Sequence, residues 1–260
     1  MDNGMTFLFI LVATSLIAML SLTGIIVLTA LKKHVHAGML TLVALSAGAM
    51  LGNAFFHLLP EAIELSEEGS IDLFTIMLLI VGSFVASFLF EQFFSWHHCH
   101  NTDHCEPTEK PFAHLVLYSD VIHNFIDGLI IAASFSVSPA LGIATTAAIA
   151  LHEIPQELGD YAVLVHGGFS KIRAAVYNGL AALTVVAGGI VGYVLAGSVE
   201  WAVPVLIPIA IGGFIYISAA DLLPELRHNA NHGGSRSSIP LHFLVFLTGL
   251  IIMIVTAMME

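Results

Sequence analysis

The sequence contains very little charge. Lys, Arg, Asp and Glu make up only 10% of its 260 residues, whereas 57% of the residues are hydrophobic. A soluble domain carries roughly a quarter charged residues, so a soluble globular protein is excluded and a polytopic membrane protein is predicted. Basic residues are scarcer still, with 7 Lys and Arg against 19 Asp and Glu. The net charge of −12 leaves no basic surface on which nucleic acid could bind.

Cysteines are also few, and we expect neither a long polar loop nor a cleavable leader. The only two cysteines are Cys99 and Cys105, so a disulfide framework is excluded. The first apolar run, about residues 5–31, is too long for a signal peptide and lacks a basic start. The longest gap between apolar runs, residues 95–111, leaves little room for a soluble domain. We therefore expect one transmembrane domain over residues 1–260.

Long hydrophobic runs, in contrast, fill the chain. Each of eight runs is near or above the ~20 residues that a membrane-spanning helix needs. The runs are too long for strands and do not alternate. They cover residues 5–31, 37–65, 71–94, 112–136, 140–167, 171–197, 201–227 and 239–259. The expected fold is all-α, with eight transmembrane helices.

The basic residues indicate how the chain crosses the membrane. All seven fall at alternate boundaries between the runs: Lys32, Lys33, Lys110, Lys171, Arg173, Arg227 and Arg236. Cytoplasmic loops are enriched in Lys and Arg, so these boundaries should face the cytosol and both termini should lie outside. We expect an integral protein of the cytoplasmic or plasma membrane.

Two polar strings lie deep inside apolar runs. They are His123-Asn124-Phe-Ile-Asp127-Gly128 and His152-Glu153-Ile-Pro155-Gln156-Glu157. His123 lies 11 residues after Phe112, about 16 Å along a helix, and His152 lies 12 residues after Ala140, about 18 Å. Both strings are therefore near the middle of a ~30 Å hydrocarbon core. Ionisable groups are costly at that depth and usually mark a functional site.

Imidazole and carboxylate groups at this spacing suit a divalent transition metal, although a proton site is the alternative. On a helix, residues four apart share a face, which pairs the side chains of each string. Pro155 removes a backbone hydrogen bond, and such a break is tolerated where a helix lines a site. A zinc protease would need a second histidine where Gln156 stands. The candidate ligands from the pattern are His123, Asp127, His152, Glu153, Gln156 and Glu157.

A Leu-Leu-Pro-Glu string occurs twice. It follows His57 at the end of the second run and Asp221 at the end of the seventh. These runs cross in opposite directions, so the two strings should lie near opposite membrane faces. The pattern predicts an inverted repeat that relates the first three helices to the last three around a central pair, as in secondary transporters.

Further polar residues extend the path away from the two strings. On the outer side we expect an entrance pathway with three residues, His57, Glu61 and Glu64. On the inner side we expect an exit pathway with Asp120, Asp160, Asp221, Glu225 and His228.

The gap over residues 95–111 is rich in imidazoles and thiols, which bind Zn²⁺ or Cu⁺ well. Their spacing matches no standard zinc finger, so a flexible chelating loop in the cytosol is predicted. Its candidate ligands are His97, His98, Cys99, His100, His104 and Cys105.

The paired strings resemble those of the ZIP family of Zrt/Irt-like metal transporters, closest to the subfamily whose fifth helix reads His-Glu-x-Pro-His-Glu. The eight helices, the outward termini and the histidine-rich loop resemble that family too. The resemblance implies import of Zn²⁺, or of Fe²⁺, Mn²⁺ or Cd²⁺, into the cytosol, with the metal as substrate and no catalytic cofactor. It also implies a 3+2+3 helical arrangement and a homodimer in the lipid bilayer.

By position, the resemblance gives a primary site of His123, Asp127, His152 and Gln156. Asn124 and Glu153 match ligands of a second site in dinuclear members. Those members also carry a glutamate on the sixth helix, where residues 181–192 contain no acid. Whether the site holds one metal ion or two therefore stays open. Gln156 replaces the histidine of the subfamily, which predicts weaker binding or a broader choice of ion.

Two other functions remain as alternatives to transport. An intramembrane zinc-dependent hydrolase would need a substrate groove near one membrane face, and a membrane metal sensor would need an output domain. The depth of the two polar strings and the predicted inverted repeat favour transport over the hydrolase and the sensor. We therefore expect that the protein is not an enzyme.

Overall fold

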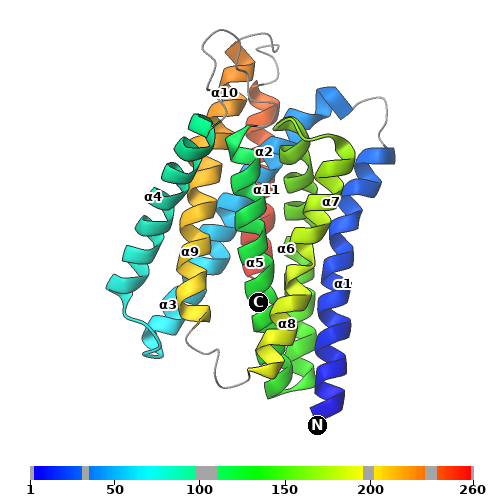
Figure 1. Cartoon of the computed structure of the whole chain (residues 1–260), viewed down its shortest axis with the longest axis vertical. Helices are drawn as coiled ribbons and strands as arrows, with labels where there is room; N and C mark the ends of the chain where they lie inside the picture. The colour runs from blue at the N-terminus through cyan, green and yellow to red at the C-terminus, as the bar shows by residue number, and fades with distance from the viewer. Residues whose placement is uncertain (1–2, 31–34, 98–109, 196–201, 232–238, 259–260) are drawn as a thin grey trace.

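The computed structural model of the chain is a bundle of helices (Figure 1). It describes residues 3–30, 35–97, 110–195, 202–231 and 239–258. Over these residues the structure contains helices and turns but no strand, which confirms the all-α prediction. The α-helices are α1 (Asn3–Ala30), α2 (Val35–Asn53), α3 (Leu59–Glu67), α4 (Leu73–His97), α5 (Pro111–Val137), α6 (Pro139–His166), α7 (Lys171–Ala182), α8 (Thr184–Val194), α9 (Val203–Tyr216), α10 (Leu223–Asn231) and α11 (Ile239–Ala257).

Six helical stretches are long and apolar enough to cross a membrane. They are Leu40–Glu67, Leu73–Phe93, Pro111–Val137, Lys171–Val194, Val203–Arg227 and Ile239–Ala257. In the most apolar part of α4 only 6% of the residues are buried in the bundle, so this helix presents hydrophobic side chains to its surroundings. Apolar side chains on the outside are what a lipid-facing helix requires. The structure therefore supports a polytopic membrane protein.

The other two predicted runs, residues 5–31 and 140–167, correspond to α1 and α6. The apolar part of α1 with described side chains is shorter, Gly4–Leu20. In α6 the apolar character is reduced by three acids, Glu153, Glu157 and Asp160. Eight spans therefore stay a prediction.

The helices pack most extensively in three pairs, α5 with α8, α2 with α11, and α4 with α9. A glycine lies at each contact. A Cβ atom added at Gly188 of α8 would lie 2.1 Å from the backbone oxygen of Phe125. A Cβ atom added at Gly249 of α11 would lie 2.4 Å from the backbone oxygen of Leu45. A Cβ atom added at Gly212 of α9 would lie equally close to the backbone of α4. Small residues let the backbones of membrane helices approach in this way.

Gly188→Ala should destabilise the fold by about 1–3 kcal/mol, because the new methyl group would push α8 away from α5. Gly179→Ala is the matched control, since nothing lies within 4 Å of a Cβ atom at that position of α7. It should be neutral or slightly stabilising, as alanine favours the helix. Thermal unfolding of the purified variants in detergent measures both. Equal effects at the two positions would contradict the packing argument.

The second and seventh runs contain the same irregularity. A π-helical turn, η1 (Ala54–Leu58), joins α2 to α3, and another, η2 (Ile217–Leu222), joins α9 to α10. In each case a proline, Pro60 or Pro224, follows two residues later. Proline has no amide hydrogen to donate, and π-turns absorb such misfits and often lie at functional sites. The repeated Leu-Leu-Pro-Glu string thus coincides with a π-helical turn in each of the two runs.

Candidate metal-binding site

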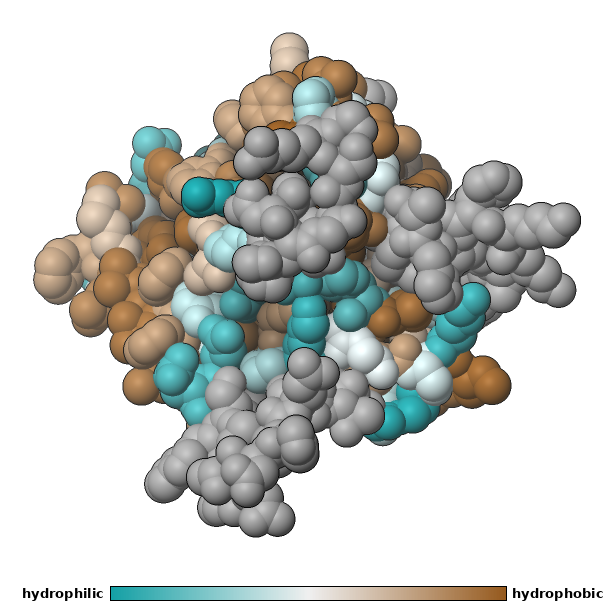
Figure 2. All heavy atoms as spheres, turned by 90° about the horizontal axis from the view of Figure 1, so that it is seen from above, coloured by the Kyte–Doolittle hydropathy of each residue, from teal (hydrophilic) through white to brown (hydrophobic). Residues whose placement is uncertain are grey.

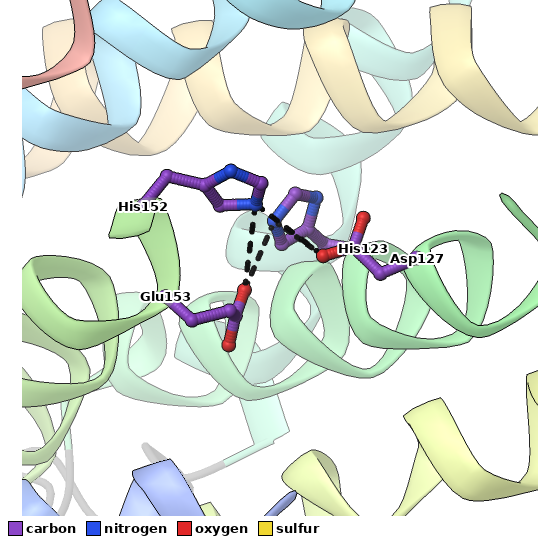
Figure 3. A group of neighbouring side chains, drawn as sticks. All are labelled: His123, Asp127, His152 and Glu153. Carbon is purple, nitrogen blue, oxygen red and sulfur yellow. Dashed lines mark hydrogen bonds and ion pairs between the residues drawn. The ribbon is translucent and has the colours of Figure 1, made fainter. Parts of the chain in front are cut away.

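Four buried side chains from α5 and α6 point toward one another (Figure 3). His123 and Asp127 lie one turn apart on α5, and His152 and Glu153 are adjacent on α6. One possible ligand atom of each lies within 4.8 Å of the others. All four residues are at most 1% exposed. We refer to these four residues as the histidine–carboxylate group.

The turn between α5 and α6 brings the two strings together. Ser138 ends α5 and caps α6, because its side-chain oxygen accepts a hydrogen bond of 3.2 Å from the backbone N–H of Leu141. Pro139 occupies the first position of α6, which needs no amide donor. A turn this short makes the two helices antiparallel neighbours, so residues at equal distances from it lie at the same level.

Imidazole nitrogens and carboxylate oxygens alternate within the group. Nε2 of His123 lies 3.3 Å from Oε1 of Glu153 and 3.7 Å from Oδ2 of Asp127. Nε2 of His152 lies 3.4 Å from Oδ2 of Asp127 and 3.8 Å from Oε1 of Glu153. Neighbouring ligands of a tetrahedral Zn²⁺ ion lie about 3.4 Å apart. The spacing is therefore one that a divalent metal can use.

The two carboxylates of the group are not balanced by a basic residue of their own helices. The sequence has no Lys or Arg between residues 111 and 170. Uncompensated carboxylates are costly to bury. A cation of charge +2 would balance both Asp127 and Glu153, and its ligands would be the kinds that transition metals prefer.

Side chains from α2 and α9 complete the surroundings of the group. Nδ2 of Asn53 donates a hydrogen bond of 2.9 Å to Oε1 of Gln156 and lies 3.3 Å from Nε2 of His123. The ring of Phe214 lies edge-on to that of His123, with centroids 5.2 Å apart. Sequence reasoning missed Asn53 and Phe214. The one available signal was that Asn53 lies four residues before His57, at helical spacing.

Asn124 and Glu157 have partners other than the four residues of the group. Nδ2 of Asn124 donates a hydrogen bond of 2.7 Å to Oδ1 of Asp120, one turn away on α5. Glu157 accepts a short hydrogen bond from Asn178 of α7. Both predicted ligands are fully buried, and so are these partners. Sequence reasoning missed Asn178 as well, since it is an isolated amide in a run without histidine or acid.

The three predicted entrance residues line one cavity. It has a volume of about 480 Å³ and includes His57, Glu61 and Glu64 among side chains that are mostly apolar. The cavity lies against η1, α3 and the first half of α6. The ring of His57 is 4.8 Å from that of His152, measured between centroids. His57 therefore lies both at the cavity and beside the histidine–carboxylate group.

Two predicted exit residues make contacts at other points of the bundle. Oε1 of Glu225 lies 2.6 Å from Nζ of Lys110 and 2.9 Å from Nε2 of His166, which joins α10 to the start of α5 and the end of α6. Asp221 of η2 interacts with Glu91 of α4. Figure 2 views the molecule from the α10 end and shows hydrophilic residues gathered near the middle of that face.

The predicted histidine-rich loop lies outside the described residues. The described part of the structure does not include the side chains of His97 and His228, nor residues His98, Cys99, His100, His104 and Cys105.

The chain is similar to known metal transporters. The family model described as ZIP Zinc transporter matches residues 97–257. Zinc transporter zipt-7.1 of Caenorhabditis briggsae is 40% identical over 126 residues, which are 47% of this chain and 32% of that protein. The human metal cation symporter ZIP14 is 40% identical over 150 residues, 56% of this chain and 30% of that protein.

A longer alignment joins the chain to zinc transporter ZIP13 of Pongo abelii, with 30% identity over 232 residues, 82% of this chain and 65% of that protein. The chain thus spans about a third of the length of zipt-7.1 and of ZIP14. The matched region of the family contains both helices of the histidine–carboxylate group and covers more than half of the 260 residues. Together with its six long apolar helices, this match identifies the chain as an integral membrane protein that belongs to the ZIP zinc transporter family.

Proposed function

We propose that this protein imports Zn²⁺, or a related ion such as Fe²⁺, Mn²⁺ or Cd²⁺, into the cytosol. The observation that carries the proposal is the histidine–carboxylate group, a set of four metal-type ligands buried between two long helices. Its mixture of imidazole and carboxylate suits Zn²⁺ best and accepts its neighbours in the transition series. The zinc and metal cation transporters among the relatives support the same class of substrate.

The proposed path begins in the cavity lined by His57, Glu61 and Glu64. His57 passes the ion to His152, whose ring it contacts. The histidine–carboxylate group then replaces the water around the ion. Its affinity must be moderate, because an ion that binds too tightly does not leave. The exit leads past Asp120, Glu157, Asp160, Asp221, Glu225 and His228 to the chelating loop.

Alternating access fits the contacts at the two ends of the path. The cavity at the entrance includes His57, whose ring lies 4.8 Å from that of His152, measured between centroids. At the α10 end, Glu225 ties α10 to α5 and α6 through Lys110 and His166. These features support a state that is accessible from outside and closed toward the cytosol. Release of the ion toward the cytosol then requires that the contacts of Glu225 with Lys110 and His166 break as α5 and α6 move against the other helices.

The proposal includes eight spans, both termini outside and a 3+2+3 inverted repeat. The equivalent π-turns of the second and seventh runs support the repeat. Lys110 precedes α5, Lys171 begins α7 and Arg227 lies in α10, so these basic residues share the end of the bundle that should face the cytosol. A homodimer in the cytoplasmic or plasma membrane is the expected assembly.

We assign the primary site to His123, Asp127, His152 and Glu153, with Gln156 as a weak fifth ligand beside it. Gln156 is held by Asn53, and its own amide nitrogen has no hydrogen-bond partner. Asn124 donates to Asp120. This arrangement supports a single ion in the histidine–carboxylate group.

Transport accounts for the site better than the two alternatives. A hydrolase must present its metal-bound water to a substrate, whereas the four ligands here are at most 1% exposed. A sensor must pass its signal to an output domain or a partner. Members of the ZIP family are transporters and not enzymes.

The test is ⁶⁵Zn²⁺ uptake into sealed proteoliposomes. The wild type should give saturable uptake, and His123→Ala/His152→Ala should abolish it, because both imidazole ligands are lost. His242→Ala is the control, since His242 lines a separate cavity between α10 and α11. Competition with Fe²⁺, Mn²⁺ and Cd²⁺ then ranks the ions.

Each outcome of this test decides a different point. No uptake by the wild type with any of the four ions would refute transport and favour the hydrolase or the sensor. Equal uptake by wild type and double variant would keep transport and reject the assigned ligands. Gel filtration of both proteins confirms that the comparison is between folded molecules.

A further inference from the structure

A groove opens between α10 and α11 at the α10 end of the bundle (Figure 1). Its volume is about 690 Å³, which is within the range of pockets that hold small ligands. α11 packs mainly against α2 and only slightly against α10, so the space between α10 and α11 stays open. We refer to this space as the α10–α11 groove.

Two helical stripes form the walls of the groove. On one wall, Ala219, Leu223 and Arg227 follow one another at intervals of four residues along η2 and α10. On the other wall, Phe243 and Phe246 lie three residues apart on α11. Residues at such intervals share one face of a helix. The groove is therefore built from the facing sides of two neighbouring helices.

The walls of the groove expose apolar side chains. Phe243 is 59% exposed, and Ala219 and Pro224 are exposed as well. Among the described lining residues, only Arg227 and His242 have polar side chains. A contiguous apolar surface that is left open, with a polar rim, marks a site for an apolar partner. The occupant of this groove must therefore be mostly apolar and carry a polar group at one end.

The ends of two apolar spans place the groove at the boundary of the membrane. The stretch Val203–Arg227 ends in one wall, and the stretch Ile239–Ala257 begins in the other. Arg227 therefore lies at the level where hydrocarbon gives way to lipid headgroups. Ala219 lies eight residues earlier, roughly 10 Å deeper along the helix. The groove thus runs from apolar walls in the hydrocarbon to a positive charge among the headgroups.

The charge of Arg227 belongs to the groove and not to the proposed exit pathway. Glu225, two residues earlier, contacts Lys110 and His166 on the inner side of α10. Residues two apart on a helix do not share a face, so α10 turns its acid inward and its base into the groove. An exposed guanidinium binds phosphate through two parallel hydrogen bonds. The groove therefore offers a phosphate contact above an apolar slot.

We propose that the α10–α11 groove binds one anionic phospholipid, with its phosphate on Arg227 and an acyl chain between Phe243 and Ala219. Basic pockets between membrane helices at the cytosolic surface suit anionic headgroups, and the cytosolic leaflet carries such lipids. The leaflet follows from the proposed orientation of the chain. The groove itself requires only that the chain spans a bilayer, so the proposal does not depend on which ion is transported.

The test measures how strongly the lipid is enriched at the groove, by quenching of tryptophan fluorescence. Trp96 and Trp201 are replaced by phenylalanine, and Phe243→Trp then places the fluorophore in the groove. The full chain is inserted into nanodiscs of phosphatidylcholine that contain a minor fraction of phosphatidylglycerol with brominated acyl chains. Phe93→Trp is the reference, because Phe93 is 54% exposed and ends the span of α4 at the same end of the bundle.

Quenching of Phe243→Trp should exceed that of Phe93→Trp and correspond to about fivefold enrichment of phosphatidylglycerol over the bulk lipid. This is the attraction expected from one basic residue beside anionic lipid. Adding Arg227→Gln should reduce the quenching to the level of the reference. Arg173→Gln is the matched control, since Arg173 lies over the rings of Phe169 and Tyr177 on another side of the bundle, and it should keep the enrichment.

Equal quenching of the two tryptophan variants would overturn the proposal, because the groove would then hold bulk lipid only. Equal enrichment of brominated phosphatidylcholine would also overturn it, since the charge of Arg227 would have no role. No quenching by either lipid at the groove would show that protein, such as a second copy of the chain, covers it.

Native mass spectrometry of the chain with its own tryptophans gives a second measurement, which does not depend on the folding of Phe243→Trp. The wild type, released from detergent with phosphatidylglycerol, should retain one lipid molecule, and Arg227→Gln should retain none. Retention by both proteins to the same extent would contradict the assigned phosphate contact.

Discussion

Asp127→Asn should lower the initial rate of Zn²⁺ uptake by at least about 100-fold at low zinc concentration. Oδ2 of Asp127 lies 3.4 Å from Nε2 of His152 and 3.7 Å from Nε2 of His123, so this carboxylate joins the two imidazoles. Asparagine keeps the shape but removes the negative charge. Loss of a residue that merely supports a metal ligand costs about 10–100-fold, and loss of a charged ligand should cost no less than the upper figure.

Asp72→Asn is the matched control for that experiment. Asp72 is an exposed residue at the start of α4, where its Oδ1 accepts a hydrogen bond of 3.0 Å from the backbone N–H of Thr75. Asparagine caps a helix as well as aspartate does. The same chemical change should therefore leave uptake at the wild-type rate. Normal uptake by folded Asp127→Asn would show that the ion crosses without this carboxylate.

The sequence predicted the histidine–carboxylate group because its causes are local. Helical spacing places His123 and Asp127 on one face, and the short turn at Ser138 makes the next helix run back beside it. Depth in the membrane then brings His152 to the level of His123. None of these steps depends on how the other helices pack.

The rest of the site depends on tertiary packing, which sequence periodicity does not contain. The spacing of the second string predicted Gln156 as a ligand, but it did not predict that its oxygen would accept a hydrogen bond from Asn53, which lies about a hundred residues earlier in the chain. Asn124 is next to His123 in the chain, yet it donates to Asp120. Amides offer a donor and an acceptor at once, and only the neighbours decide which end points at the site.

The π-turns show the same limit in the backbone. The repeated Leu-Leu-Pro-Glu string predicted equivalent positions in the second and seventh runs, but not that the helix would widen before each proline. A proline inside a helix can be accommodated by a kink or by a π-turn. The chosen form depends on the neighbours, such as Ala47, whose backbone oxygen accepts a hydrogen bond of 2.7 Å from Ser218 in η2.

Asn53 offers the sharpest test of such a contact, because two substitutions should act in opposite directions. Asn53→Leu removes the amide that donates to Oε1 of Gln156, so a buried acceptor loses its partner and the wall beside His123 loses a polar group from α2. We expect Zn²⁺ affinity to fall by about 10–100-fold, the range for residues that orient metal ligands.

Asn53→Asp should instead raise the affinity by about tenfold. The new carboxylate would replace an amide nitrogen that lies 3.3 Å from Nε2 of His123, a spacing shared by ligands of one ion. Gln156 can turn its unpartnered Nε2 toward the carboxylate and so preserve their hydrogen bond. Because tighter binding slows release, the maximal rate of uptake should fall while the zinc concentration for half-maximal uptake also falls. Competition against a fluorescent zinc chelator gives the affinities, and ⁶⁵Zn²⁺ uptake gives the rates. If both substitutions weaken binding to the same extent, Asn53 only shapes the cavity, and its amide has no part in holding the ion.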